Sequence, residues 1–144
     1  MADVLLMDLD GTLCDGAAGL HLGDHDYHHY ATTDAPARPE MLAVIRDAAG
    51  RGIETVVVTG RYARWQPAAE LWLWRVRVHP LEFHSRSDSD WRPNRVVKSE
   101  ILADIRTRHN VVAAYDDDPR NLEVFRAAGI PLVVAVGEFD RRLA

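Results

Sequence analysis

The sequence predicts an α/β protein with a doubly wound, mostly parallel sheet. Short apolar runs alternate with helix-length amphipathic stretches along the 144 residues, and polar residues follow the apolar runs directly. Strands separated by helices form βαβ units, and such units build a parallel sheet covered on both faces. The length predicts a single domain over residues 1–144, because a domain has roughly 100–200 residues.

The first half of the chain is expected to hold two strands and two helices. The apolar run 4–7 predicts a strand that ends at Asp8, and a polar loop rich in Gly, His and Asp extends over 11–37. Pro39 suits the first turn of a helix, which Gly50 and Gly52 end. A strand over 53–58 and a helix over 63–74 follow.

The second half continues the alternation. Val76, Val78 and Leu81 predict a third strand despite Pro80, and Gly129 closes the last helix. The expected elements are a strand over 76–83, a charged loop over 85–93, a helix through 97–105, a strand over 111–115, a helix over 119–128 and a strand over 130–136.

Composition excludes several classes of protein. With 47% hydrophobic and 27% charged residues, the chain is typical of a globular protein. No stretch approaches the ~20 apolar residues of a membrane span, so no membrane partner is expected. The N-terminus lacks the basic segment of a secretory signal. A single cysteine, Cys14, predicts a reducing cytoplasm and a packed, inert thiol.

Basic residues are distributed unevenly. Segment 61–98 holds seven arginines and Lys98 against four acids, a net of 8 − 4 = +4, whereas the whole chain has −5. This asymmetry is compatible with an anionic partner approaching one face, and also with a dispersed solvated surface. Lys98 is the only lysine, which indicates a position that prefers a compact ammonium to a guanidinium.

Polar residues gather where three predicted strands end, and ligands of doubly wound sheets bind beyond the carboxyl ends of the strands. Asp8 and Asp10 follow the first predicted strand, and the acidic run 116–118 follows a later one. So many carboxylates at one edge need a cation or protons to compensate them, and oxygen ligands favour Mg²⁺ or Ca²⁺. The alternative for the first pair is a polar strand end with an Asx turn.

Two further segments bring groups suited to an anion. Thr59 offers a hydroxyl and Gly60 an accessible amide, although Thr59 is alternatively the N-cap of the next helix. Lys98 lies near the start of a helix, with a solvated helix residue as the alternative. A metal site, a hydroxyl, an amide-rich turn and a lysine together suit the stabilisation of a phosphoryl group in transfer.

Four motifs resemble those of the haloacid dehalogenase (HAD) superfamily, in the same order. They are DLDGTL at 8–13, VVVTGR at 56–61, VVKSEIL at 96–102 and AYDDDPRNLEVFRAAGI at 114–130. The segments DWRPNRVVKSEIL, LEVFRAAGI and VAVGEFD are most similar to the 3′-phosphatase domain of bacteriophage-type polynucleotide kinases. The resemblance implies a HAD-like Rossmannoid fold without a large cap domain.

The resemblance also implies residue roles. Asp8 matches the nucleophile that accepts the phosphoryl group, and Asp10 matches the general acid and base. The remaining implied site residues are Thr59 and Lys98 for catalysis, Thr12, Gly60 and Arg61 for substrate binding, and Asp8, the Asp10 carbonyl, Asp116 and Asp117 for Mg²⁺.

The expected function is a Mg²⁺-dependent phosphomonoesterase that acts through phospho-Asp8 on 3′-phosphates of nucleic-acid ends. The alternatives are a small-molecule or nucleotide phosphatase and a non-enzymatic phospho-acceptor domain. No GxxxxGK[ST] motif is present, so no Walker-type kinase half is expected in this chain.

Two features depart from the family pattern. Segment 11–37 lacks arginine, and Asp118 stands where the family often has arginine, a change for which Arg120 could compensate. The histidines of that segment are expected to be solvated, with a transition-metal site as the alternative; they are His21, His25, His28 and His29. The tryptophans Trp65, Trp72 and Trp74 are expected to pack in the core or an interface, with base stacking as the alternative.

Overall fold

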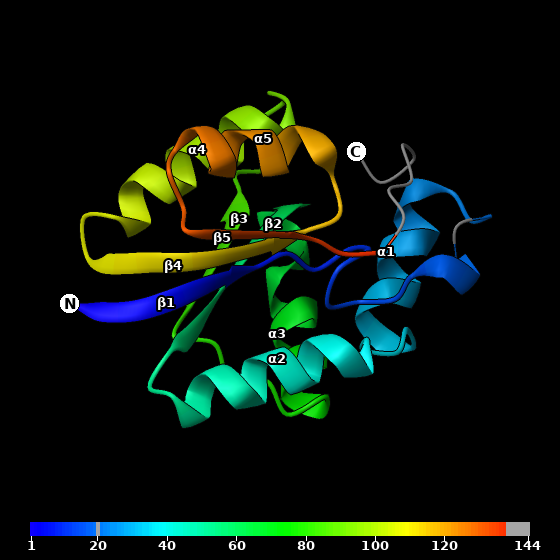
Figure 1. The fold of residues 1–144 in the computed structure, drawn as a ribbon. Helices are drawn as coiled ribbons and strands as arrows, with labels where there is room; N and C mark the ends of the chain where they lie inside the picture. Colours follow the sequence, from blue (N-terminus) through cyan, green and yellow to red (C-terminus); the bar gives the residue numbers. More distant parts are fainter. Residues whose placement is uncertain (20, 138–144) are drawn as a thin grey trace.

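Five parallel strands form one sheet with helices on both faces (Figure 1). The computed structural model describes residues 1–19 and 21–137, without the side chains of 24–26, 32 and 33. The strand order is β3-β2-β1-β4-β5. The doubly wound α/β fold predicted from the sequence is therefore confirmed. The strands are β1 (Ala2–Met7), β2 (Glu54–Tyr62), β3 (Glu82–Arg86), β4 (His109–Asp116) and β5 (Leu132–Ala135).

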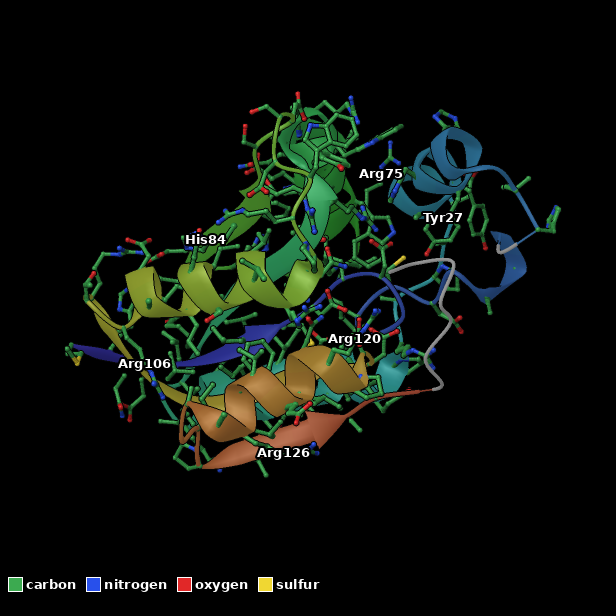
Figure 2. All side chains as sticks on the ribbon, turned by 90° about the horizontal axis from the view of Figure 1, so that it is seen from above. Tyr27, Arg75, His84, Arg106, Arg120 and Arg126 are labelled. Carbon is green, nitrogen blue, oxygen red and sulfur yellow. The ribbon has the colours of Figure 1, made fainter. Side chains whose placement is uncertain are left out.

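Four helices form the outer layers. One face of the sheet carries α2 (Pro39–Gly50) and α3 (Gln66–Arg75) (Figure 1). The other face carries α4 (Asn94–Ile105) and α5 (Pro119–Ala127), which lie side by side in Figures 1 and 2. A fifth helix, α1 (Asp24–Thr33), lies beyond the carboxyl edge of the sheet.

The central strand β1 separates two apolar cores. Leu5 and Met7 belong to the core beneath α2 and α3, which includes Trp72. Val4 and Leu6 belong to the opposite core, which includes Phe125. Because successive side chains of a strand point to opposite faces, burial on both faces requires a continuous apolar run. This double burial fixes β1 and brings the residues that follow it to the carboxyl edge.

Segment 11–37 is not a loop throughout, contrary to the prediction. It contains a 3₁₀ turn, η1 (Ala17–Gly19), and helix α1. Tyr27 and Ala31 are buried and four residues apart, so they form the inward face of one helical turn. Two apolar positions among polar neighbours are too few to produce a helical periodicity in the sequence.

The third strand predicted over 76–83 is present but begins later than expected. Val76 caps the end of α3, Arg77 has a φ of 63°, and the Val78 amide donates to the Leu73 carbonyl at 2.9 Å. The alternating apolar residues therefore pack a helix end, and β3 begins only at Glu82. The charged loop starts correspondingly later, after Arg86.

The remaining elements differ from prediction mainly at their ends. The helix expected over 63–74 is divided into a 3₁₀ turn, η2 (Ala63–Trp65), and α3.

The longest described helices, α2 and α4, have 12 residues each, whereas a membrane span needs about 20. Among the residues described here, no helix has the length and apolar character to cross a bilayer.

Candidate active site

Lys98 joins two strand ends at the centre of the candidate site. Its Nζ donates to Asp8 Oδ1 at 2.9 Å and to Asp116 Oδ2 at 2.6 Å. Asp8 follows β1, Asp116 ends β4, and Lys98 lies one turn into α4, which begins at Asn94. All three side chains are buried. The alternative of a solvated helix lysine is therefore wrong.

Three carboxylates converge beside this lysine. Oxygens of Asp8, Asp116 and Asp117 all lie within 4.8 Å of one another. The Thr12 hydroxyl is 3.1 Å from Asp8 Oδ2 and 3.3 Å from Asp117 Oδ1, so it can donate to either carboxylate. Gly11 has a φ of +78°, and a Cβ there would lie 2.3 Å from Asp117 Oδ2. The positive φ favours glycine, and a larger residue here would displace the Asp117 carboxylate.

The carboxylate group carries excess negative charge. Three carboxylates against one ammonium give −3 + 1 = −2. Burial and the charge of Asp116 raise the pKa of Asp8 well above its ordinary 3.8, although Lys98 opposes them. Burial likewise raises the pKa of Asp117 to about 6. A divalent cation would balance this charge, and an all-oxygen donor set of carboxylates fits Mg²⁺.

The second motif acid has a different environment. Arg61 holds Asp10 through two hydrogen bonds, Nε to Oδ2 and Nη2 to Oδ1, both 2.7 Å long. The Tyr27 hydroxyl donates to Asp10 Oδ1 at 3.2 Å. Burial alone would raise the pKa of Asp10, but the charge and hydrogen bonds of Arg61 outweigh it and lower this pKa. The charges of Asp10 and Arg61 therefore neutralise each other, next to the three carboxylates that could bind a metal ion.

Arg61 retains one unused donor. Its Nη1 is buried and has no hydrogen-bond partner among the residues described. A buried donor without an acceptor is costly, so this nitrogen is suited to an acceptor supplied by a ligand. A phosphate oxygen has that property.

Thr59 and Gly60 lie near the end of β2, beside Arg61. Thr59 is 1% exposed, and its Oγ1 accepts a hydrogen bond from the Arg61 amide at 3.1 Å. The next helical turn, η2, has Tyr62 as its N-cap, so the N-cap alternative for Thr59 is wrong. A Cβ on Gly60 would lie 2.5 Å from Asn94 Oδ1, so any side chain here would displace that of Asn94.

Asp118 belongs to the helix rather than to the carboxylate group. It is the N-cap of α5, and its Oδ1 accepts from the Arg120 amide at 2.9 Å. The Arg120 guanidinium also pairs with it, Nη2 to Oδ2 at 3.0 Å. Figure 2 shows Arg120 on α5 and Arg126 further along the same helix. Where the family often has an arginine, this chain therefore has an aspartate whose negative charge is paired with Arg120 two residues later.

Three buried polar residues of the site region were not predicted from the sequence. Asn121 Nδ2 lies 3.3 Å from Asp116 Oδ2, and its burial beside Leu122 on α5 places a polar group on an apolar helix face. Tyr27, labelled on α1 in Figure 2, donates a hydrogen bond from its hydroxyl to Asp10. Arg86 ends β3 and donates to the Gly60 carbonyl at 2.8 Å. Only Asn121 had a sequence signal, its helical spacing from Phe125.

The histidines of segment 11–37 do not form a metal site among the residues described. His21 and His29 are exposed, whereas His28 is half-buried with its ring centre 5.4 Å from that of Trp65. The side chain of His25 lies outside the described residues. Within the described part of the chain, the acidic trio is the group with metal-ligating geometry.

The tryptophans and the cysteine behave largely as expected. Trp72 is buried, and its Nε1 donates to the Ala35 carbonyl at 2.9 Å. Trp74 is 67% exposed, so core packing is wrong for it. Cys14 is buried, which confirms a packed cysteine, and burial raises the pKa of its thiol to about 12, as expected for an inert thiol.

The basic surplus of segment 61–98 is mostly internal. Arg61, Arg86 and Lys98 are buried, which leaves five basic residues against four acids, or 5 − 4 = +1. The net positive charge that segment 61–98 can offer an anionic partner is therefore smaller than the sequence count suggested.

Comparison with known proteins establishes the family and the fold. The sequence matches the family described as the polynucleotide kinase PNKP phosphatase domain over residues 2–139. A search of the curated proteins found no match.

Two similar solved structures come from assemblies of the same kind. A chain of the Pnkp1/Rnl/Hen1 complex has a TM-score of 0.84 and 20% identity, over 97% of this chain and 47% of that chain. A chain of the Pnkp1/Rnl/Hen1 RNA repair complex has a TM-score of 0.81 and 22% identity, over 96% and 44%. This chain thus spans less than half of either.

A third similar structure is a class C acid phosphatase from Bacillus anthracis with tungstate bound. Its TM-score is 0.70 at 15% identity, over 95% of this chain and 67% of that chain. These likenesses show a HAD-like fold with no large cap among the described residues. The family match covers nearly the whole chain, so it identifies more than the fold. The chain belongs to the polynucleotide kinase phosphatase-domain family and is a HAD-type phosphoric monoester hydrolase.

Proposed function

We propose that this domain removes 3′-phosphates from nucleic-acid ends by a Mg²⁺-dependent reaction through an aspartyl phosphate on Asp8. The observation that carries the chemistry is the contact of Lys98 with both Asp8 and Asp116, which unites three sequence motifs at one point. The family supports the substrate class, because its description names polynucleotide kinase.

Each site residue has a role in this proposal. An oxygen of Asp8 attacks the phosphorus while the bond from phosphorus to the 3′ oxygen breaks. Lys98 holds the Asp8 carboxylate and contributes positive charge to the transferring group. Asp10 gives a proton to the departing 3′ oxygen, and later takes one from the water that hydrolyses the aspartyl phosphate. Phosphate is then released.

Substrate binding is assigned to the end of β2 and to Thr12. Thr59 and the Gly60 amide would donate hydrogen bonds to phosphoryl oxygens, and Arg61 would offer its unused Nη1. Arg61 also neutralises Asp10, so its shift toward phosphate would free that carboxyl for proton transfer.

Asp8, Asp116 and Asp117, with the Asp10 carbonyl, would hold Mg²⁺. When bound, the ion would neutralise charge on the phosphoryl group and on the carboxylates around it. The charge of −2 at the cluster and the raised pKa of Asp117 support this assignment.

The test is phosphate release in the presence of Mg²⁺ from three substrates: 3′-phosphorylated oligonucleotides, 5′-phosphorylated oligonucleotides and 3′-mononucleotides. We expect the 3′-phosphorylated strand to have the highest kcat/KM, and Asp8→Asn to lose turnover. The matched control is Asp47→Asn, since Asp47 is an exposed aspartate of α2. Equal rates on 3′ and 5′ ends would contradict the substrate assignment and leave the phosphatase chemistry intact.

A small-molecule or nucleotide phosphatase is the second candidate. The small surplus of basic charge among the non-buried residues of 61–98 favours it, because extended nucleic-acid binding is strongly electrostatic. A higher kcat/KM on a mononucleotide or sugar phosphate than on the oligonucleotide would support this candidate. Membership of a phosphatase family sets aside the alternative of a non-enzymatic phospho-acceptor.

A further inference from the structure

Two aromatic side chains lie together next to the candidate site. The ring centres of Tyr62 and Trp91 are 6.4 Å apart at an interplanar angle of 62°. Trp91 is 84% exposed, and Arg64 lies over the Tyr62 ring at 4.7 Å from its centre. Tyr62 directly follows Arg61, the residue with the unused buried donor. We refer to Tyr62 and Trp91 as the aromatic platform.

Buried Arg86 ties the platform to the phosphate-binding end of β2. Its Nε donates to the Gly60 carbonyl at 2.8 Å, and its Nη1 donates to the carbonyls of Arg92 at 2.6 Å and Asp90 at 3.4 Å. One guanidinium thus binds backbone carbonyls on both sides of Trp91 and also the Gly60 carbonyl near the end of β2. Because a guanidinium is planar with fixed donor directions, it holds these segments in one arrangement.

The loop that carries Trp91 has further anchors. The Arg92 side chain donates to Asp90 Oδ2 at 2.9 Å and to Glu100 on α4. Arg86 Nη2 also bonds Asn94 Oδ1 at the start of α4. An isolated exposed tryptophan is unremarkable on a protein surface. Here the buried Arg86 fixes the backbone on both sides of Trp91 and so holds an exposed indole beside the active site. This arrangement indicates a ligand with a flat apolar face.

Charge alone does not provide affinity for a nucleic-acid strand here. Within 61–98 the residues that are not buried have a surplus of only +1, because three of the eight basic residues are buried. Proteins that bind single strands combine positive charge with aromatic side chains on which bases stack. With little charge available, stacking has to supply a larger share.

We propose that the aromatic platform stacks the nucleobase of the nucleotide whose 3′-phosphate enters the site. This inference rests on the proposed function, since it requires the phosphate to lie against Arg61 and Gly60. The flat face of any base would serve, so the platform predicts little sequence preference and a requirement for an unpaired end.

The test is a binding cycle with single-stranded 3′-phosphorylated oligonucleotides. One strand carries a normal 3′-terminal nucleotide, and an otherwise identical strand lacks the base there. Both are titrated by fluorescence anisotropy against Asp8→Asn protein, which prevents turnover, with and without Trp91→Ala or Trp91→Phe. Trp74→Ala is the matched control, because Trp74 is 67% exposed at the far end of α3.

We expect Trp91→Ala to weaken binding of the normal strand by about 5- to 150-fold, the range for loss of one base stack. Trp91→Phe retains most of the affinity, and Trp74→Ala changes nothing. Removal of the terminal base should weaken binding to the protein that retains Trp91 by a similar factor. The affinity of the Trp91→Ala variant should be the same for both strands.

Equal weakening of both strands by Trp91→Ala, or no weakening at all, would overturn the platform. So would a change from dimer to monomer in Trp91→Ala, measured by sedimentation, with unchanged oligonucleotide affinity, because the indole would then serve contact between copies. Base-dependent binding without phosphate release by the parent protein would support the platform while the proposed function fails.

Discussion

Replacement of Asp117 should stabilise the metal-free protein at neutral pH. Burial raises the pKa of Asp117 from its ordinary 3.8 to about 6 in the folded state. A difference of roughly 2 pKa units at about 1.4 kcal/mol each corresponds to about 3 kcal/mol. Asp117→Asn removes this ionisation and keeps a side chain of the same shape.

The sign of the pH dependence follows from proton binding. Above about pH 4 the unfolded chain loses the Asp117 proton, whereas the folded protein retains it up to about pH 6. Between these values the folded state binds more protons, so stability falls as pH rises. The difference between wild type and Asp117→Asn should therefore grow from near zero at pH 4 to about 3 kcal/mol above pH 6.

Urea unfolding with a metal chelator, from pH 4 to 8, measures this difference. Asp47→Asn is the control, because Asp47 is exposed on α2 and should follow wild type. Added Mg²⁺ should stabilise wild type more than Asp117→Asn, since a ligand of the ion is missing in the variant. A metal-free Asp117→Asn that is less stable than wild type at pH 7.5, or an offset independent of pH, would refute the reasoning.

Three further changes test other parts of the site and fold. Lys98→Met should lower the free energy of unfolding by about 3–5 kcal/mol in urea, because it leaves buried carboxylates unpaired; a loss under about 1 kcal/mol would contradict this. Gly11→Ala should abolish Mg²⁺ binding in calorimetry, since its Cβ would lie 2.3 Å from Asp117 Oδ2, and unchanged affinity would refute the proposed geometry. Hydrogen bonding from Arg108 lowers the pKa of Glu82 from 4.5 to about 2, so its contribution to stability is full above about pH 4.5 and lost toward pH 2. In Glu82→Gln the free energy of unfolding should depend less steeply on pH between pH 4.5 and 2 than in wild type. An equal dependence would count against the Arg108–Glu82 contact.

The fold was largely predictable because its central strands are buried on both faces. The run 4–7 reads as continuously apolar for that reason. Helix α1 was missed because Tyr27 and Ala31 supply its only described buried side chains. The third strand was predicted too early, over 76–83, because apolar residues that pack the end of α3 alternate as in a strand.

The site residues were predictable where each directly follows a strand. Asp8 directly follows β1 and Asp116 is the last residue of β4, while Lys98 lies on the helix that precedes β4. Tyr27 and Arg86 could not be predicted in this way. Their partners Asp10 and Gly60 are distant in sequence, and their contacts depend on how α1 and β3 meet the sheet edge.

The most direct test of the proposed mechanism is to trap the covalent intermediate on Asp8. Rapid acid quenching during turnover of a 3′-phosphorylated oligonucleotide with Mg²⁺, followed by borohydride reduction and mass spectrometry, identifies the aspartate that carries the acyl phosphate. We expect homoserine at position 8 in wild type and no turnover in Asp8→Asn. Turnover retained by Asp8→Asn, or reduction at a different residue, would contradict the account.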